Sequence, residues 1–161
     1  MLIALRIFNR AGLLVGPIPV SAVVRTDAEW RSQLTAEQYG ITRSHGTEAP
    51  FCGTLLDNKQ EGVYSCVCCG LPLFASSDKF DSGTGWPSFV RPIAVENVTT
   101  VTDTSYGMTR SEIRCSRCQA HLGHVFPDGP APTRERHCLN SESLNFTATT
   151  ALATLADPTA G

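Results

Sequence analysis

Cys138 has the neighbours of a chemical nucleophile. It lies in the segment Arg136-His137-Cys138-Leu139-Asn140. Cationic neighbours favour the thiolate form of a cysteine, and the thiolate is the form that attacks an electrophile. Free cysteine is also among the residue types most often buried in a core, so this segment alone leaves an inert thiol as an equal alternative.

Two histidines and an aspartate precede Cys138 in the chain. His121, His124 and Asp128 lie within residues 121–130, which end in a Pro-Asp-Gly-Pro turn signal. Such a turn can fold these side chains back over Cys138. A histidine can hold a proton near neutral pH and donate it, so the segment contains the parts of a cysteine nucleophile with an acid–base set. The alternative is that both histidines are ordinary polar loop residues.

Four of the seven cysteines form two pairs with equal spacing. They are Cys66-x-x-Cys69 and Cys115-x-x-Cys118. Two such pairs, each in a turn after a strand, predict a tetrahedral four-thiolate zinc site, which is structural because it leaves no open coordination position. Two disulfides or a thioredoxin-like redox pair are the alternatives. Disulfides are disfavoured in a reducing compartment, and no βαβ pattern surrounds the pairs.

The three remaining cysteines suggest redox chemistry. They are Cys52, Cys68 and Cys138. A cysteine that is oxidised to a sulfenic acid can condense with a second thiol to form a disulfide. Cys68 lies between two predicted metal ligands, and we interpret it as a bystander.

Composition excludes several other classes of protein. The chain has 161 residues, enough for one domain with a core, and a formal net charge of −2. This charge gives no sign of a nucleic-acid or anionic-membrane partner. No run of 18 apolar residues predicts a membrane span. Frequent glycine and proline favour turns, and the threonine and valine that cluster in the middle of the chain favour β-structure.

Local patterns predict the elements that position these side chains. Capping boxes at Thr26 and Thr35 predict two short helices, over residues 27–33 and 36–44. β-Rich runs predict strands over residues 62–67, 95–104, 106–115, 124–126, 138–140 and 144–147, with the second and third forming a hairpin.

The two ends of the chain differ in composition from the middle. Residues 1–25 contain no acidic residue and mix short apolar pieces with arginine. They match neither a secretory signal nor a serine-rich transit peptide, so we expect a non-core extension. Residues 148–161 are rich in Ala and Thr and are expected to form a loose, flexible tail.

Four motifs together resemble the B-type methionine-R-sulfoxide reductases. Over residues 26–147 these are the two cysteine pairs, Gly-Thr-Gly-Trp-Pro-Ser-Phe at 83–89, residues 121–130 and residues 136–141. The resemblance implies a small, mainly β domain of two antiparallel sheets, like a tent or barrel, with short N-terminal helices and a structural zinc site. It also implies reduction of methionine-R-sulfoxide, mainly in peptides and proteins, with thioredoxin as the reductant.

The resemblance implies a role for each matching residue. Cys138 matches the nucleophile, and His121, His124 and Asp128 match the acid and its supports. The other implied roles are those of Arg136 and Asn140, which flank and polarise the nucleophile, and of Trp86 and Phe126, which bind the substrate.

Two positions depart from the family pattern. His137 stands where many members have tyrosine, and Thr84 stands where many have their resolving cysteine. Cys52 fits a second family pattern, in which the resolving thiol lies nearer the N-terminus. We expect a cytoplasmic monomer. A zinc-dependent binding module with an inert Cys138 is one rival, and a catalytic-zinc hydrolase is a weaker one.

Overall fold

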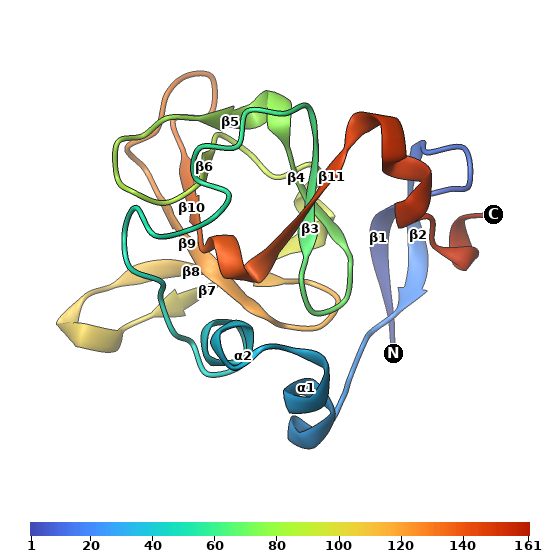
Figure 1. Cartoon of the computed structure of the whole chain (residues 1–161), viewed down its shortest axis with the longest axis horizontal. Coiled ribbons are helices and arrows are strands. Elements are labelled where there is room, and N and C mark those ends of the chain that lie inside the picture. The colour runs from blue at the N-terminus through green and yellow to red at the C-terminus, as the bar shows by residue number, and fades with distance from the viewer.

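The chain is built mainly of antiparallel β-strands in three sheets (Figure 1). The structure is a computed structural model that describes residues 1–161. The largest sheet has six strands in the order β5-β6-β10-β9-β8-β7, the second has the order β11-β3-β4, and the third is the pair β1-β2. The predicted mainly β fold with two antiparallel sheets and short N-terminal helices is confirmed, and the chain adds a third, two-stranded sheet.

The elements have the following bounds. The first seven strands are β1 Leu2–Phe8, β2 Leu14–Ser21, β3 Gly62–Cys66, β4 Pro72–Ala75, β5 Lys79–Phe80, β6 Ser88–Phe89 and β7 Val98–Asp103. The last four strands are β8 Arg110–Cys115, β9 His121–Phe126, β10 Arg136–Leu139 and β11 Leu144–Ala148. The α-helices are α1 Asp27–Gln33 and α2 Ala36–Thr42. The 3-10 turns are η1 Ser76–Asp78, η2 Val95–Asn97, η3 Ser105–Gly107, η4 Ser141–Ser143, η5 Thr149–Leu155 and η6 Pro158–Ala160.

Both α-helices begin at the predicted capping boxes. The Thr26 hydroxyl accepts a hydrogen bond from the Glu29 N–H, and the Glu29 carboxylate accepts one from the Thr26 N–H. Thr35 and Gln38 repeat this exchange at the start of α2. These reciprocal bonds satisfy N–H groups that have no partner inside a helix. The second helix ends at Thr42, two residues before its predicted end.

The register of the six-stranded sheet brings distant side chains together. Cys138 on β10 lies opposite His124 on β9, and His124 lies opposite Glu112 on β8. Gly123 makes this pairing possible, because a Cβ at that position would lie 1.9 Å from the Cys138 carbonyl oxygen. Only glycine avoids that clash.

Aromatic side chains fill the core between the two larger sheets. The rings of Phe74 and Phe89 stack with centroids 4.6 Å apart, and Tyr64 meets Phe89 edge-on at 5.1 Å. All three side chains are fully buried. Each residue of β3 is buried, as expected for a central strand covered on both faces.

The expectation that residues 1–25 lie outside the core is wrong. Leu5, Ile7 and Val20 belong to the main cluster of buried apolar side chains. The β1-β2 hairpin is tied to the domain by Asn97, whose amide oxygen accepts the Arg6 N–H at 3.0 Å and whose amide nitrogen donates to the Arg6 carbonyl at 2.9 Å. The short apolar pieces thus form strands that bury alternate side chains.

The expectation of a loose tail is also wrong. The end of the chain forms η5 and η6 and lies beside the N-terminal hairpin (Figure 1). The Asp157 N–H donates to the Phe8 carbonyl at 2.9 Å. The Asp157 carboxylate pairs with Arg117 at 2.8 Å. The two ends of the chain therefore support each other.

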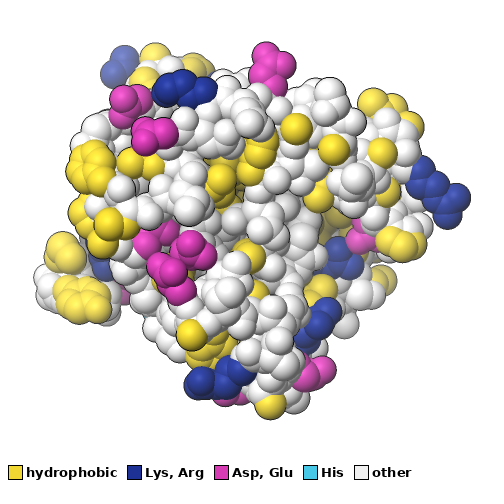
Figure 2. Space-filling view, viewed as in Figure 1, with side chains coloured by type: hydrophobic (Ala, Val, Ile, Leu, Met, Phe, Trp, Pro, Cys, Tyr) yellow, Lys and Arg dark blue, Asp and Glu magenta, His cyan; other side chains and the backbone are white.

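Charged side chains are scattered over the surface. The face in Figure 2 shows isolated basic and acidic groups without a large basic patch. The tip of the β7-β8 hairpin protrudes from the molecule (Figure 1). Tyr106 and Met108, which lie between these two strands, are exposed. No helix is long and apolar enough to cross a membrane.

Candidate active site

Cys138 lines a pocket of about 230 Å³ on the six-stranded sheet. The residues predicted from the sequence that share this pocket are Cys138, His124, Arg136, Asn140, Trp86 and Phe126. Three other predicted residues, His121, Asp128 and Cys52, do not line it. The fold therefore gathers residues from β9, β10 and the loop before β6 around one thiol.

Burial and charge act on the Cys138 thiol in opposite directions. Burial raises the pKa of this thiol, while Arg136 and a hydrogen bond from Thr84 act to lower the same pKa. Burial has the larger effect, so the pKa lies above its ordinary value. Arg136 acts in the direction that the sequence predicts, but burial outweighs it, and neighbours in sequence do not report how far a residue is buried.

Aromatic rings form the walls of the pocket. Trp86 is held by a 3.0 Å hydrogen bond from its indole N–H to the Glu48 carbonyl oxygen. The Arg136 guanidinium lies over the Phe126 ring, 4.4 Å from its centroid. Both contacts restrict the side chains that would meet an apolar substrate group.

Each predicted histidine is held by a carboxylate from the β7-β8 hairpin. His124 Nε2 lies 2.8 Å from Asp103 Oδ2, and His121 Nδ1 lies 2.7 Å from Glu112 Oε2. The two rings meet edge-on with centroids 5.4 Å apart. His45 also approaches the Glu112 carboxylate, at 3.4 Å. Burial lowers the pKa of His121 despite the opposing effect of Glu112, so this ring favours the neutral form.

Asp128 contacts neither histidine and instead binds Arg136. Its two carboxylate oxygens accept hydrogen bonds from the Arg136 guanidinium at 2.9 and 3.1 Å. This two-point contact fixes the plane of the guanidinium. Asp128 therefore acts on the charge beside Cys138 and not on the acid.

Asn140 connects the pocket to the loop around Glu48, which lies 92 residues earlier in the chain. Its amide oxygen accepts the Glu48 N–H at 3.1 Å, and its amide nitrogen donates to the Leu122 carbonyl at 3.2 Å. The Glu48 carboxylate in turn accepts the Glu142 N–H at 3.1 Å. Asn140 is thus buried in a network that fixes the start of the loop containing Cys52.

Cys52 is exposed on a loop that packs against the Thr84–Trp86 turn. The Phe51 N–H donates to the Gly85 carbonyl at 2.7 Å. Gly85 has a φ of +93°, and a Cβ there would lie 2.9 Å from the Phe51 ring. Cys68 is buried at the end of the molecule that contains the four paired cysteines, called the metal end below because these thiols can hold a metal ion. The Gln33 side chain donates a hydrogen bond to the Cys68 carbonyl there.

The four paired cysteines lie together as the spacing predicts. Their sulfur atoms all lie within 4.8 Å of one another, with Cys66 and Cys118 at 3.7 Å and Cys69 and Cys115 at 3.5 Å. A cluster of this kind can hold one metal ion. It lies at the end of β8 opposite Arg110, so it is separated from the pocket by the length of that strand.

Sequence reasoning missed the residues that support the pocket from outside the motifs. These are Thr47, Glu48, Asp103, Arg110 and Glu112. Their only local signal is that Asp103 and Glu112 are acids in otherwise β-rich runs. Their partners lie on other strands, and a single sequence does not give that register.

Comparisons with known proteins agree with this geometry. The SelR domain model matches residues 34–148. A "Peptide methionine sulfoxide reductase MsrB" of Hahella chejuensis is 59% identical over 124 residues, which cover 77% of this chain and 89% of the relative. The protein with that name in Caulobacter vibrioides is 61% identical over 127 residues, 79% of each chain. The Escherichia coli O139:H28 protein is 56% identical over 119 residues, 74% of this chain and 87% of the relative.

The SelR match excludes the N-terminal hairpin and α1, and it contains every element that lines the pocket and the cysteine cluster. The relatives carry the name of an oxidoreductase. The chain therefore belongs to the SelR-domain family of MsrB methionine sulfoxide reductases, and it is an enzyme of that family.

Proposed function

We propose that this protein reduces the R epimer of methionine sulfoxide to methionine, mainly in peptides and proteins. The observation that carries the proposal is the Cys138 pocket, where one thiol shares a cavity with His124, Arg136 and two aromatic walls. The names of the relatives support the reaction, and one reductase for each sulfoxide epimer is the general rule.

The first half-reaction transfers the sulfoxide oxygen to the enzyme. Cys138 sulfur attacks the sulfoxide sulfur, while His124 donates a proton to the sulfoxide oxygen. The hydroxyl group then passes from the substrate sulfur to the Cys138 sulfur: the substrate sulfur–oxygen bond and the transient sulfur–sulfur bond break, and a sulfur–oxygen bond forms at Cys138. Methionine leaves, and Cys138 is oxidised to a sulfenic acid by the two electrons that reduce the sulfoxide. The Cys138 thiol loses one proton and His124 donates one proton to the substrate oxygen, so the number of protons is unchanged over the half-reaction. Arg136 favours the developing thiolate, while Trp86 and Phe126 hold the methyl–sulfur group.

The second half-reaction regenerates the thiol. The Cys52 thiol condenses with the Cys138 sulfenic acid, which forms a disulfide and releases water. Thioredoxin then reduces this disulfide by exchange and is itself oxidised. Exposure of Cys52 on the loop beside the Thr84 turn supports it as the resolving thiol, whereas burial of Cys68 at the metal end argues against that residue.

The four-cysteine cluster is proposed to hold one structural Zn²⁺. Zinc–thiolate bonds of about 2.3 Å in a tetrahedron place sulfur atoms about 3.8 Å apart. The observed sulfur–sulfur distances of 3.5 and 3.7 Å fit this arrangement. A bound ion would join the turn after β3 to the turn after β8 and would take no part in the reduction of the sulfoxide.

The test is activity on separate R and S sulfoxide peptides with dithiothreitol as the reductant. We expect methionine from the R epimer and none from the S epimer. A binding module with an inert Cys138 would produce methionine from neither. Equal turnover of both epimers would contradict the proposed selectivity.

A further inference from the structure

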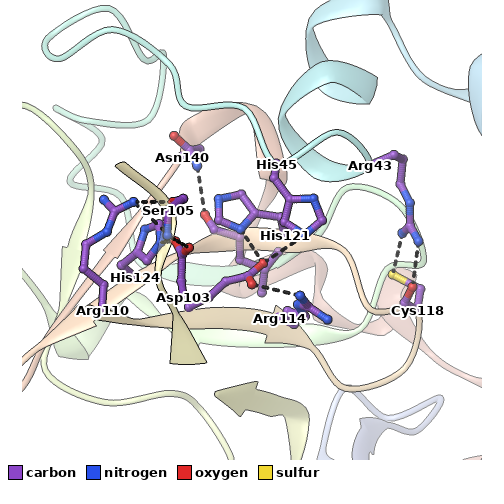
Figure 3. A network of polar contacts seen from close by, with 12 residues as sticks. Arg43, His45, Asp103, Ser105, Arg110, Arg114, Cys118, His121, His124 and Asn140 are labelled. Atoms are coloured by element: carbon purple, nitrogen blue, oxygen red, sulfur yellow. Dashed lines mark hydrogen bonds and ion pairs between the residues drawn. The ribbon is translucent and has the colours of Figure 1, made fainter. Parts of the chain in front are cut away.

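The proposed reaction needs a histidine whose proton is held at a defined atom, and Asp128 does not supply that control. Both Asp128 oxygens are bonded to Arg136. The side chain that contacts His124 comes instead from the end of β7. It is the carboxylate of Asp103, whose Oδ2 lies 2.8 Å from His124 Nε2 (Figure 3).

Asp103 is itself fixed from two sides. Its Oδ1 accepts the Ser105 N–H at 2.9 Å, and its Oδ2 lies 3.3 Å from Arg110 Nη2. Arg110 Nη2 also donates to the Ser105 hydroxyl at 3.4 Å. The Ser105 N–H, and then the His124 hydrogen bond, hold the pKa of Asp103 well below its ordinary value. The carboxylate therefore stays ionised wherever the enzyme works, and it can only accept hydrogen bonds.

This contact decides which nitrogen of His124 carries hydrogen. An ionised carboxylate at 2.8 Å from Nε2 requires an N–H at Nε2. The neutral ring is then unprotonated at Nδ1, and the proton gained on ionisation resides there. Nδ1 forms no hydrogen bond with the protein. His124 also lines the Cys138 pocket, so Nδ1 is the atom left for chemistry.

We propose that Asp103 is the positioning residue of His124: it fixes hydrogen on Nε2, places a negative charge beside the ring and makes Nδ1 the atom that protonates the sulfoxide oxygen. This inference rests on the proposed function. It assigns to Asp103 the supporting role that the sequence motif suggests for Asp128.

Charged and titratable groups from four strands surround His124. They are Asp103 from β7, Arg110 and Glu112 from β8, His121 from β9, and Arg136 and Cys138 from β10. Glu112 is already bonded to His121 and Arg114. Asp103 is the one carboxylate within hydrogen-bond distance of the His124 ring.

The test compares the pH dependence of kcat in two variants that carry the same chemical change. Asp103→Asn removes the negative charge from His124, and Asp128→Asn removes one from Arg136. In the wild type, activity falls as pH rises and the acid loses its proton. In Asp103→Asn we expect this falling limb to move to lower pH by roughly 1–2 units, with a loss of roughly 10–100-fold in kcat at pH 8 and little change in KM.

The matched Asp128→Asn variant should keep the limb at its wild-type pH, whatever its effect on rate through Arg136. Asp103→Glu keeps the charge and should also keep the limb in place. The proposal is overturned if Asp103→Asn leaves the limb unmoved, or if Asp128→Asn moves it as far. A purely structural role of Asp103 would lower the rate at all pH values without moving the limb.

A measurement on the unmodified protein keeps the inference testable if Asp103→Asn does not fold. Nitrogen-15 NMR of the histidine rings identifies the neutral tautomer of His124. We expect hydrogen on Nε2, and hydrogen on Nδ1 would overturn the proposal. This result does not depend on turnover, whereas a wild-type enzyme that reduces no sulfoxide would contradict the proposed function.

Discussion

Cys138 combines a partly buried thiol with a fixed cation beside it. The Arg136 guanidinium is held by Asp128 on one side and by the Phe126 ring on the other. Burial raises the pKa of this thiol, and the fixed guanidinium acts to lower the same pKa.

Replacement of Cys138 by serine should abolish sulfoxide reduction, including reduction driven by dithiothreitol. A serine hydroxyl is a much weaker nucleophile than a thiol and cannot form the sulfenic acid. Release of methionine from an R-sulfoxide peptide, measured by chromatography, checks this result. Cys68→Ser is the matched control and should keep wild-type activity, because Cys68 lies outside the pocket. A Cys138→Ser enzyme with near wild-type turnover would refute the assignment.

The pH dependence of stability should reflect the buried imidazole of His137. Burial lowers the pKa of this side chain in the folded protein. Below the unfolded pKa of about 6.5 the unfolded chain binds more protons, so stability should fall as pH decreases from about 7. His137→Tyr removes this titration and should flatten the slope of melting temperature against pH between 7 and 5.5. An unchanged slope in that variant would contradict the explanation.

The β1-β2 hairpin contributes to the stability of the fold and not to the pocket, because its apolar side chains pack in the core and none of them lines the pocket. Leu5 is fully buried, whereas Leu2 on the same strand is 67% exposed. Leu5→Ala should lower the free energy of unfolding by about 2–5 kcal/mol, because it removes packed methyl groups and leaves a cavity. Leu2→Ala should change it by less than about 0.5 kcal/mol. Denaturant unfolding measures both, and equal small effects would show that the hairpin does not pack as described.

The turn of Cys66 and Cys69 and the turn of Cys115 and Cys118 bring their four sulfur atoms together, where one metal ion can link them. Cys118→Ser should lower the bound zinc per chain and reduce the melting temperature, because structural metal binding contributes directly to folding free energy. Cys68→Ser, which changes a thiol in the other cysteine turn that is not one of the four clustered sulfur atoms, should keep full zinc content. Elemental analysis and thermal melting check both. Full zinc and unchanged melting in Cys118→Ser would exclude the site.

Recycling of Cys138 depends on the arrangement of the whole molecule. The metal end contains five of the seven cysteines, and the pocket end contains Cys138 with Cys52 on a neighbouring loop. Thr84 contacts the Cys138 thiol but cannot form a disulfide. The Cys52 loop is held at Glu48, at Phe51 by the Gly85 carbonyl, and again where the Leu55 N–H donates to Ser141. Cys52 lies in the short segment between the last two of these contacts.

Cys52→Ser should keep one turnover and activity driven by dithiothreitol, but it should lose turnover driven by thioredoxin. Without Cys52, the disulfide that thioredoxin attacks does not form. The Cys52→Ser/Thr84→Cys double variant should regain part of that turnover. Mass spectrometry after one turnover identifies the disulfide, which should join Cys52 to Cys138. A disulfide between Cys68 and Cys138, or none, would refute this scheme.

The sequence alone determined the features that depend on short-range chemistry. The capping boxes at Thr26 and Thr35 placed both helices, because their hydrogen bonds close within three residues. The cysteine spacing predicted the four-sulfur cluster, because each pair spans one turn. The sequence motifs identified six of the eleven residues that line the Cys138 pocket, namely Trp86, His124, Phe126, Arg136, Cys138 and Asn140.

Only the tertiary structure decided the features that depend on register and burial. Strand pairing placed Asp103 and Glu112 beside the histidines and left Asp128 with Arg136. The raised pKa of Cys138 follows from burial that outweighs Arg136, and burial is set by the whole chain. The apolar N-terminal residues likewise became core only because Asn97 and the C-terminal turns provide a surface on which β1 can pack.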